Sequence, residues 1–408
     1  MNCVMLGAGM HPTYSHSPVT RLSAFSGWLS LPQLITWGSV FYTFSLLMAP
    51  LEAELDMTRA QSSLAFSLAL LAEGAGAWLV GRWIDQGHER AVMALGSAWV
   101  GAGLLAHSLV SSLWGFYAVW VWLGLGMAAT LYTPAFAVVT RRYPQDFRRA
   151  IITLTFLGGL ASTVFIPLSS WWIELWGWRH ALWALAAIQL LLCAPLHAWL
   201  LQGVRQHPHH HAQQVQSSVR QHLKAPFWLL ALFMVLMMSI TSALPAHMIN
   251  LLQEAGLSPA WVVAVPAAIG VIQVLGRLLL FVFERHWNVH TANRWIPSLI
   301  PMGLLALVVG GVTPDAAIVF VLFFGLGNGL NTIVKGTAMA QYVSAAHVGQ
   351  LNGVLGMPVA LARAAAPLML GVLWSPTQGY TYGLWWMLCA SLLGMAALWA
   401  AQAMALKR

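Results

Sequence analysis

FWLLALFMVLMMSITSALPAHMIN, residues 227–250, contains 24 residues and no Lys, Arg, Asp or Glu. A helix needs about 20 mainly apolar residues to cross the hydrocarbon core of a bilayer, so this stretch is long enough to span a membrane. The whole chain has the same character, because 59% of its 408 residues are hydrophobic and 7% are charged. Soluble domains carry about 25% charged residues, and disordered chains carry few hydrophobic ones. The composition therefore excludes both of these classes.

Two other classes are also excluded. The 19 Lys and Arg residues give a net charge of +8 but are not gathered on one amphipathic segment, which argues against a nucleic-acid partner. The apolar stretches are continuous runs without alternation, which argues against a membrane β-barrel. Cys3, Cys193 and Cys389 lie far apart, so they predict neither a disulfide framework nor a metal site. A helical membrane protein with several spans remains.

The chain contains twelve stretches long enough to cross a membrane, which predicts an all-α membrane protein of two six-helix halves. We expect the spans at Phe25–Met48, Ala60–Val80, Ala91–Val110, Leu113–Val138, Ile151–Trp172, Trp178–Leu200, Phe227–Asn250, Trp261–Phe283, Trp295–Val312, Ala316–Ala338, Val348–Leu373 and Tyr380–Ala401. The long polar stretch Gln202–Lys224 separates the sixth span from the seventh. We therefore expect a tail at 1–24, halves at 25–201 and 226–404, a central loop at 202–225 and a tail at 405–408.

The distribution of basic residues predicts the orientation of the chain. Fourteen of the 19 Lys and Arg residues lie on the side of the termini, and two, Arg59 and Arg179, lie on the other side. Lys and Arg concentrate in cytoplasmic loops, so we expect both termini and the central loop in the cytoplasm. The first 20 residues lack an apolar core and a cleavage site, which predicts a cytoplasmic tail and not a signal peptide.

The two halves contain matching short motifs in the same order. The matched pairs are Val80-Gly81-Arg82 with Leu275-Gly276-Arg277, Gly124-Leu125-Gly126 with Gly325-Leu326-Gly327, Pro167 with Pro367, and Gly177 with Gly379. The offsets between them stay near 200 residues, which indicates an internal parallel repeat. Such repeats are typical of transporters whose substrate site lies at mid-membrane between the halves.

The stretch from Gly81 to Arg90, Gly-Arg-Trp-Ile-Asp-Gln-Gly-His-Glu-Arg, resembles the signature loop of the major facilitator superfamily. A narrower resemblance, to bacterial members of the monocarboxylate porter and oxalate–formate antiporter group, lies in Arg148-Arg149-Ala150, Gly158-Gly159, Pro167 and Gly177-Trp178-Arg179. The resemblance implies alternating access, a functional monomer and a multi-pass protein of the inner (plasma) membrane. It also implies that cations in spans eight and eleven bind an anionic substrate, which corresponds to Arg277 and Arg363.

Charged residues at membrane depth are costly and are therefore candidates for function. Arg363 lies near the middle of span eleven, too deep to reach the interface, and its guanidinium suits a carboxylate. The alternative is a buried arginine bonded to backbone carbonyls. For Arg277 there are two alternatives. The family resemblance implies that it binds substrate, whereas its match to Arg82 in the internal repeat implies a role in gating. Lys335 lies closer to the cytoplasm, where it either takes part in gating or extends to the interface.

Glu73 in the middle of span two is the candidate for coupling, because burial favours protonation of a carboxylate. It serves equally well as a fixed counter-ion for one of the cations. Asn328 and Asn331 share one face of span ten, and Thr130 and Tyr132 lie in span four. These four residues either orient a substrate or bond to neighbouring helices. In the loop between spans two and three we expect Gly81, Asp85 and Arg90 to form a gating latch.

The sequence predicts a secondary active transporter for a small organic anion, such as a carboxylate, driven by proton symport or anion exchange. The spans hold three cations and one carboxylate, and a positive cavity attracts anions. An exporter of drugs or metabolites with an apolar cavity is the alternative. His207–His211 and the Met234–Met238 pair suit a metal less well than a solvated loop and apolar packing. We expect no cofactor and no enzyme activity, because the chain lacks a phosphate-binding G-x-x-x-x-G-K-[ST] loop and an H-E-x-x-H motif.

Overall fold

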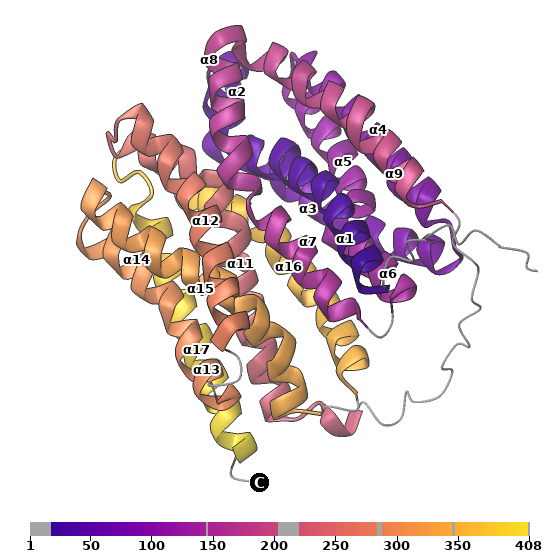
Figure 1. Ribbon diagram of the computed structural model, residues 1–408. Helices are drawn as coiled ribbons and strands as arrows, with labels where there is room; N and C mark the ends of the chain where they lie inside the picture. The colour runs from indigo at the N-terminus through magenta and orange to yellow at the C-terminus, as the bar shows by residue number, and fades with distance from the viewer. Residues whose placement is uncertain (1–17, 144–145, 203–219, 284–287, 345–346, 407–408) are drawn as a thin grey trace, which may run out of the picture.

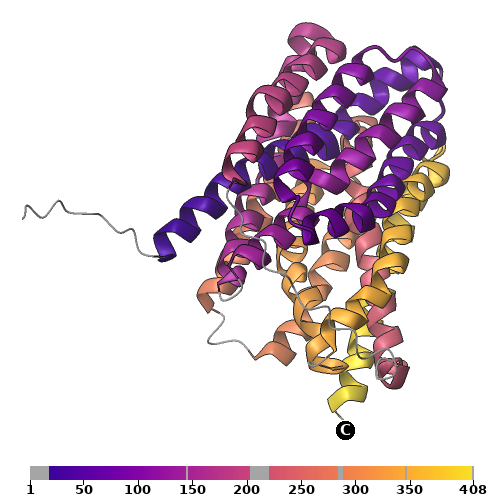
Figure 2. The same ribbon diagram turned by 90° about the vertical axis from the view of Figure 1, so that its right-hand side faces the viewer.

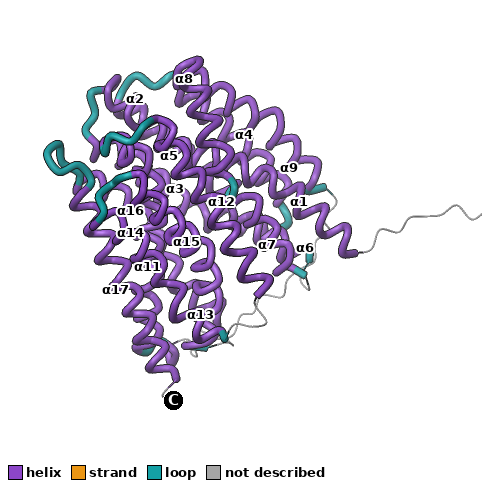
Figure 3. The backbone as a smooth tube through the Cα atoms, turned by 60° about the vertical axis from the view of Figure 1, so that its left-hand side comes forward, coloured by secondary structure: helices purple, strands orange, loops and turns teal. Residues whose placement is uncertain are grey.

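A computed structural model describes residues 18–143, 146–202, 220–283, 288–344 and 347–406. Helices account for nearly all of this described chain, and short loops join them (Figure 3). The extended backbone in it amounts to one isolated bridge between Ser375 and Gly379. The prediction of an all-α protein is therefore confirmed. The His207–His211 tract and Cys3 lie outside the described residues.

The first half of the chain forms helices from Pro18 to Leu200. They are α1 (Pro18–Thr36), the π-helical turn η1 (Trp37–Tyr42), α2 (Thr43–Leu55), α3 (Arg59–Asp85), α4 (Glu89–Ser108), α5 (Leu113–Thr130), α6 (Tyr132–Arg142), α7 (Phe147–Gly159), α8 (Ala161–Ile188), the π-helical turn η2 (Gln189–Cys193) and α9 (Ala194–Leu200).

The second half forms helices from Arg220 to Leu406. They are the 3-10 turn η3 (Arg220–His222), α11 (Ala225–Glu254), α12 (Pro259–Phe283), α13 (Val289–Trp295), the 3-10 turn η5 (Ile296–Ser298), α14 (Leu299–Val309), α15 (Pro314–Tyr342), α16 (Val348–Leu373) and α17 (Thr381–Leu406).

Local sequence signals fix where several of these helices begin. Thr58 caps α3 in a reciprocal capping box with Gln61. At the start of α5, the Ser112 hydroxyl accepts a hydrogen bond from the Gly115 amide. At the start of α15, the Thr313 hydroxyl accepts one from the Ala316 amide. Such caps satisfy backbone N–H groups that have no partner within the helix.

Eleven helical ranges in the described chain are long and apolar enough to cross a membrane, against the twelve that we expected. The difference arises at one range, Arg149–Leu200, whose 52 residues are more than twice the length of one crossing. Gly177 interrupts it with a non-helical backbone (φ 78°). This range therefore contains both the fifth and the sixth predicted spans. Gly379, the predicted match of Gly177, also has a positive φ of 51°.

Each half packs around its own apolar core. One cluster of buried residues lies within the second half except for Ile166, and another lies within the first half except for Ala246 and Ala364. The halves meet mainly where α3 crosses α16 and where α8 crosses α12 (Figure 1). The start of α1 and the end of α17 lie toward the same end of the bundle (Figure 2). We call this the termini end, and we call the opposite end, with the turns at Asp56, Gly177, Gly256, Gly311 and Gly379, the hairpin end.

Glycines permit the closest helix crossings inside each half. A methyl group at Gly124 of α5 would lie 2.1 Å from the carbonyl oxygen of Ala69 in α3. A methyl group at Gly329 of α15 would lie 2.1 Å from the carbonyl oxygen of Gln273 in α12. The crossing of spans two and four thus recurs as the crossing of spans eight and ten. Gly329 lies about one helical turn after Gly325, the residue that the sequence matches to Gly124.

We expect Gly124→Ala to lower the free energy of unfolding by about 1–3 kcal/mol, because the new methyl group meets backbone that cannot move aside. Thermal unfolding followed by tryptophan fluorescence in detergent measures the effect. Gly353→Ala is the matched control, since a methyl group there would have no neighbour within 4 Å. Equal melting temperatures for the two variants would contradict this account of the crossing.

The contacts between the two halves along α3 and α16 are closest toward the hairpin end. Along α3 and α16, a methyl group at Gly371 would lie 2.3 Å from the Ser63 hydroxyl oxygen, and one at Gly74 would lie 3.3 Å from Ala360. Nearer the termini end, added methyl groups at Gly81 and Gly353 would meet nothing within 4 Å. The close contacts between α3 and α16 therefore lie toward the hairpin end.

Candidate site between the halves

An ion pair joins the two halves in the middle of the bundle. Nη2 of Arg363 in α16 lies 3.3 Å from Oε2 of Glu73 in α3, with 21% and 11% of the two side chains exposed. Glu73 is fourteen residues from the start of α3, a rise of about 21 Å. A guanidinium has five N–H donors, and Arg363 uses one of them within the described chain. The pair is therefore partly solvated, and Arg363 retains donors for a further anion.

Arg277 also reaches across the interface. Its Nη1 donates a 2.5 Å hydrogen bond to the Thr155 carbonyl oxygen in α7, while its Nε is buried and has no partner among the described residues. A methyl group at Gly159 would lie 2.8 Å from Nη1, so the guanidinium packs directly against this glycine. Tyr132 contacts the neighbouring Gly158 and interacts electrostatically with Arg277. The structure thus brings Tyr132 and Arg277 together.

Lys335 completes a group of three cations. Its Nζ lies 3.0 Å from the Met238 sulfur, a weak acceptor, and it is within electrostatic reach of both Arg363 and Arg277. With Glu73 as their counter-ion, the three side chains leave an excess of positive charge between the halves. The sequence matched Arg277 to Arg82, but Arg82 is exposed and stacks on Trp78, so the two arginines occupy different environments.

Neutral polar residues lie beside the cations on the hairpin side. Asn328 donates to Oε1 of Gln273 (3.0 Å), and Gln273 donates to the Gly159 carbonyl oxygen (2.7 Å). A small cavity of about 30 Å³ adjoins them. It is lined from both halves by Tyr42, Ser162, Ile166, Thr241, Pro245, Met248, Pro266, Ile269, Phe324 and Asn328.

The two remaining polar candidates lie elsewhere. The Thr130 hydroxyl donates to the Gly126 carbonyl oxygen of its own helix, and its carbonyl oxygen accepts from Gln33. Thr130 therefore holds the first half together. Asn331 is 1% exposed, and neither amide atom has a hydrogen-bond partner in the described part of the chain. Its place in a substrate site stays a prediction.

The loop between α3 and α4 lies at the termini end. Asp85 is exposed and forms no ion pair with the described residues, and Nε of Arg90 donates to the Ala198 carbonyl oxygen (2.8 Å). The neighbouring Glu89 instead pairs with Arg141 at 3.3 Å, and Arg141 also donates to the Ile84 carbonyl oxygen. The gating roles of Gly81, Asp85 and Arg90 stay predictions.

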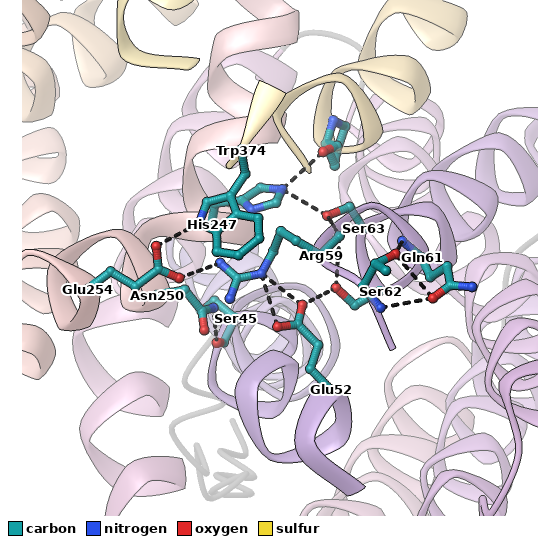
Figure 4. Close-up of polar contacts among 12 residues, drawn as sticks. Ser45, Glu52, Arg59, Gln61, Ser62, Ser63, His247, Asn250, Glu254 and Trp374 are labelled. Carbon is teal, nitrogen blue, oxygen red and sulfur yellow. Dashed lines mark hydrogen bonds and ion pairs between the residues drawn. The ribbon is translucent and has the colours of Figure 1, made fainter. Parts of the chain in front are cut away.

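A second cross-half network, at the hairpin end, was not expected from the sequence. Arg59, at the first position of α3, binds Oε1 of Glu52 through Nε (2.8 Å) and Oε1 of Glu254 through Nη1 (2.9 Å) (Figure 4). The same Nη1 donates to the Tyr380 hydroxyl (2.5 Å). The guanidinium carbon lies 4.9 Å from the Trp374 ring centroid, and Trp374 donates to Glu254. Arg59 is 8% exposed, so the network is almost closed to solvent.

His247 extends this network inward. Its Nε2 lies 3.0 Å from the Pro367 carbonyl oxygen, which can only accept, so Nε2 carries the proton and Nδ1 accepts from the Tyr380 hydroxyl (2.9 Å). A tyrosine phenol is protonated at neutral pH and can therefore donate. Tyr380 therefore accepts from Arg59 and donates to His247 at the same time.

Metal binding has no support in the described chain. No group of three or more His, Cys, Asp or Glu side chains in it is placed to hold a metal ion. Met238, one of the two methionines weighed as soft ligands, contacts Lys335 instead.

The sequence profile of the Major Facilitator Superfamily matches residues 31–367. The chain belongs to this superfamily. Its fold is similar to that of a mutant of the nucleoside transporter NupG (TM-score 0.73, 16% identity, 94% of this chain and 99% of that one). It is also similar to an inward-facing, unoccupied bacterial homologue of the human lysosomal transporter Spinster (TM-score 0.71, 16% identity, 96% and 99%) and to tetrameric PepTSo2 (0.66, 12%, 95% and 98%). At these identities the likeness shows the fold alone. No curated protein matches the chain.

Proposed function

We propose that this superfamily member is a secondary active transporter of a small organic anion, and that its substrate is a carboxylate. The observation that carries the proposal is the convergence of Arg363, Arg277 and Lys335 on one mid-membrane region that contains one carboxylate, Glu73. Uncompensated positive charge at this depth is costly, and a bound anion would offset that cost.

Arg363 is the principal binding residue in this proposal. Its free N–H donors suit a bidentate contact with a carboxylate, and its partial exposure gives the anion access. Arg277 and Lys335 add attraction through the local field. Neutral hydrogen-bonding groups lie beside the cations, on Tyr132, Asn328 and Gln273. They would orient the part of the substrate that does not carry the carboxylate.

Alternating access supplies the transport cycle. With the termini in the cytoplasm of the cell, the closely packed hairpin end faces outward and the termini end faces inward. The substrate would cross the membrane when the two halves rock about the central site and expose it first to one side and then to the other. Proton symport, with Glu73 as the proton acceptor, or exchange against a second anion supplies the energy. The resemblance to the monocarboxylate porter and oxalate–formate antiporter group, the inner-membrane location and a functional monomer belong to the same proposal.

Uptake into proteoliposomes tests the proposal directly. Purified protein is reconstituted, and labelled mono- and dicarboxylates are offered with a pH gradient, without one, and after preloading with unlabelled anion. We expect at least one carboxylate to accumulate above protein-free liposomes, faster with an inward proton gradient or an exchangeable anion. Movement of cationic or neutral apolar compounds with no carboxylate uptake would favour the exporter of the same fold.

A further inference from the structure

The hairpin-end network contains one side chain that contacts both halves through charged groups. Arg59 belongs to the first half, as does Glu52, whereas Glu254 and Tyr380 belong to the second. Oε1 of Glu52 also accepts from the Ser62 hydroxyl, so this carboxylate is fixed within the first half. Any separation of the halves at this end must therefore break the contacts of Arg59 with Glu254 and Tyr380, while its contact with Glu52 can remain.

Three further cross-half hydrogen bonds surround these contacts. His247 Nε2 lies 3.3 Å from the Ser63 hydroxyl, Asn250 donates to the Ser45 carbonyl oxygen (3.2 Å), and the Leu368 amide donates to the Ser67 hydroxyl (3.0 Å). All three are neutral, and a neutral hydrogen bond is about half as strong as a charge-assisted one. The contacts of Arg59 are therefore the strongest polar interactions between the two halves at this end.

We propose that Arg59 is the gate residue of the hairpin end, which holds the halves together there by binding Glu254 and Tyr380 and releases them when that end opens. The environment of Arg59 supports this role. The guanidinium is almost fully buried and rests on Trp374, so its contacts are shielded from water and salt. Removal of the guanidinium leaves Glu254 with Trp374 as its remaining hydrogen-bond donor among the described residues. The role does not depend on the charge of the passenger.

A second arginine at this end provides a control for the gate. Arg179 lies at the same end and binds Glu54 with Nη1 at 2.8 Å and Nη2 at 2.5 Å, again beside a tryptophan, Trp178. Arg179 and Glu54 both belong to the first half. Loss of this ion pair, whose side chains are 38% and 37% exposed, removes an Arg–Glu contact at the same end without releasing the second half.

Distance measurements between spin labels test the gate without any transport assay. Labels are placed at Ser111→Cys in the first half and Thr377→Cys in the second, both exposed at the hairpin end, in full-length protein with Cys3, Cys193 and Cys389 replaced. Double electron–electron resonance in lipid nanodiscs then gives the populations of closed and open distances. We expect Arg59→Ala to raise the ratio of open to closed molecules at least tenfold.

Two other variants complete the test. Glu254→Gln keeps the shape of the side chain but removes its charge, and we expect a smaller increase in the same direction; it replaces Arg59→Ala if that variant does not fold. Arg179→Ala should give the native distance distribution. The gate assignment is overturned if both Arg59→Ala and Glu254→Gln keep the native distribution, or if Arg179→Ala opens the hairpin end as much as they do.

Discussion

Uptake of the transported carboxylate is expected to fall about 100-fold or more when Arg363 is replaced by alanine. A hydrogen bond to a charged group contributes about 1.5–3 kcal/mol, and a bidentate contact contains two of them. Loss of even one such bond corresponds to about tenfold or more in affinity. Initial uptake rates in proteoliposomes, measured over a range of carboxylate concentrations, separate an effect on apparent affinity from an effect on the maximal rate.

Two variants show whether the effect of Arg363 is specific. Arg363→Lys keeps the charge but loses the planar fork of donors, so we expect intermediate uptake. Arg179→Ala removes an arginine whose ion pair with Glu54 lies within the first half, and it should leave uptake near the native level. Native uptake by Arg363→Ala, in protein that melts at the native temperature, would refute a substrate role for this residue.

Glu73→Gln is expected to abolish the stimulation of uptake by a proton gradient while leaving exchange of labelled for unlabelled anion in place. Glu73 accepts a hydrogen bond from Arg363 across the two halves, so a carboxylate substrate that binds Arg363 competes with Glu73 for this arginine. The displaced Glu73 carboxylate would be stabilised by taking up a proton, which links one proton to one passenger. Glutamine cannot carry that proton, but anion exchange does not require it.

Uptake with and without a proton gradient, together with anion exchange at equal pH, measures this prediction. The ratio of uptake with the gradient to uptake without it should drop to one in Glu73→Gln, with exchange preserved, and should stay at the native value in Glu89→Gln, whose ion pair with Arg141 lies within the first half. If proton stimulation survives in Glu73→Gln, Glu73 is a fixed counter-ion and energy enters by another route.

The apolar runs made the fold predictable, because few structures other than membrane helices contain so many uncharged stretches of 20 residues. The limits of the spans were less predictable. The fifth and sixth spans form one nearly continuous helical range. Gly177 has a non-helical backbone and kinks this range, but the helix resumes directly after it. The two π-helical turns, at Trp37–Tyr42 and Gln189–Cys193, also have no clear sequence signal.

The four charged candidates could be chosen from the sequence because a charge inside a span is rare and costly. Arg59 gave no such signal, since it lies at the first position of a helix and its partner Glu254 is 195 residues away. Gln273 and Tyr42 are neutral and cost less to bury, so they did not stand out within their apolar runs. Arg82 and Arg277 share a local motif, but their different depths required the helix packing to be known.

The separation of the apolar cores has a consequence for how the carrier can evolve. Because nearly all residues of the two buried apolar clusters lie within one half, the proposed rocking would exchange few of their contacts, whereas polar groups such as Ser67 and Asn250 bond across the boundary. One neutral hydrogen bond of this kind contributes about 1 kcal/mol, which changes the balance between two conformers about fivefold. Point substitutions at that boundary can therefore retune turnover speed while each half keeps its own folding stability.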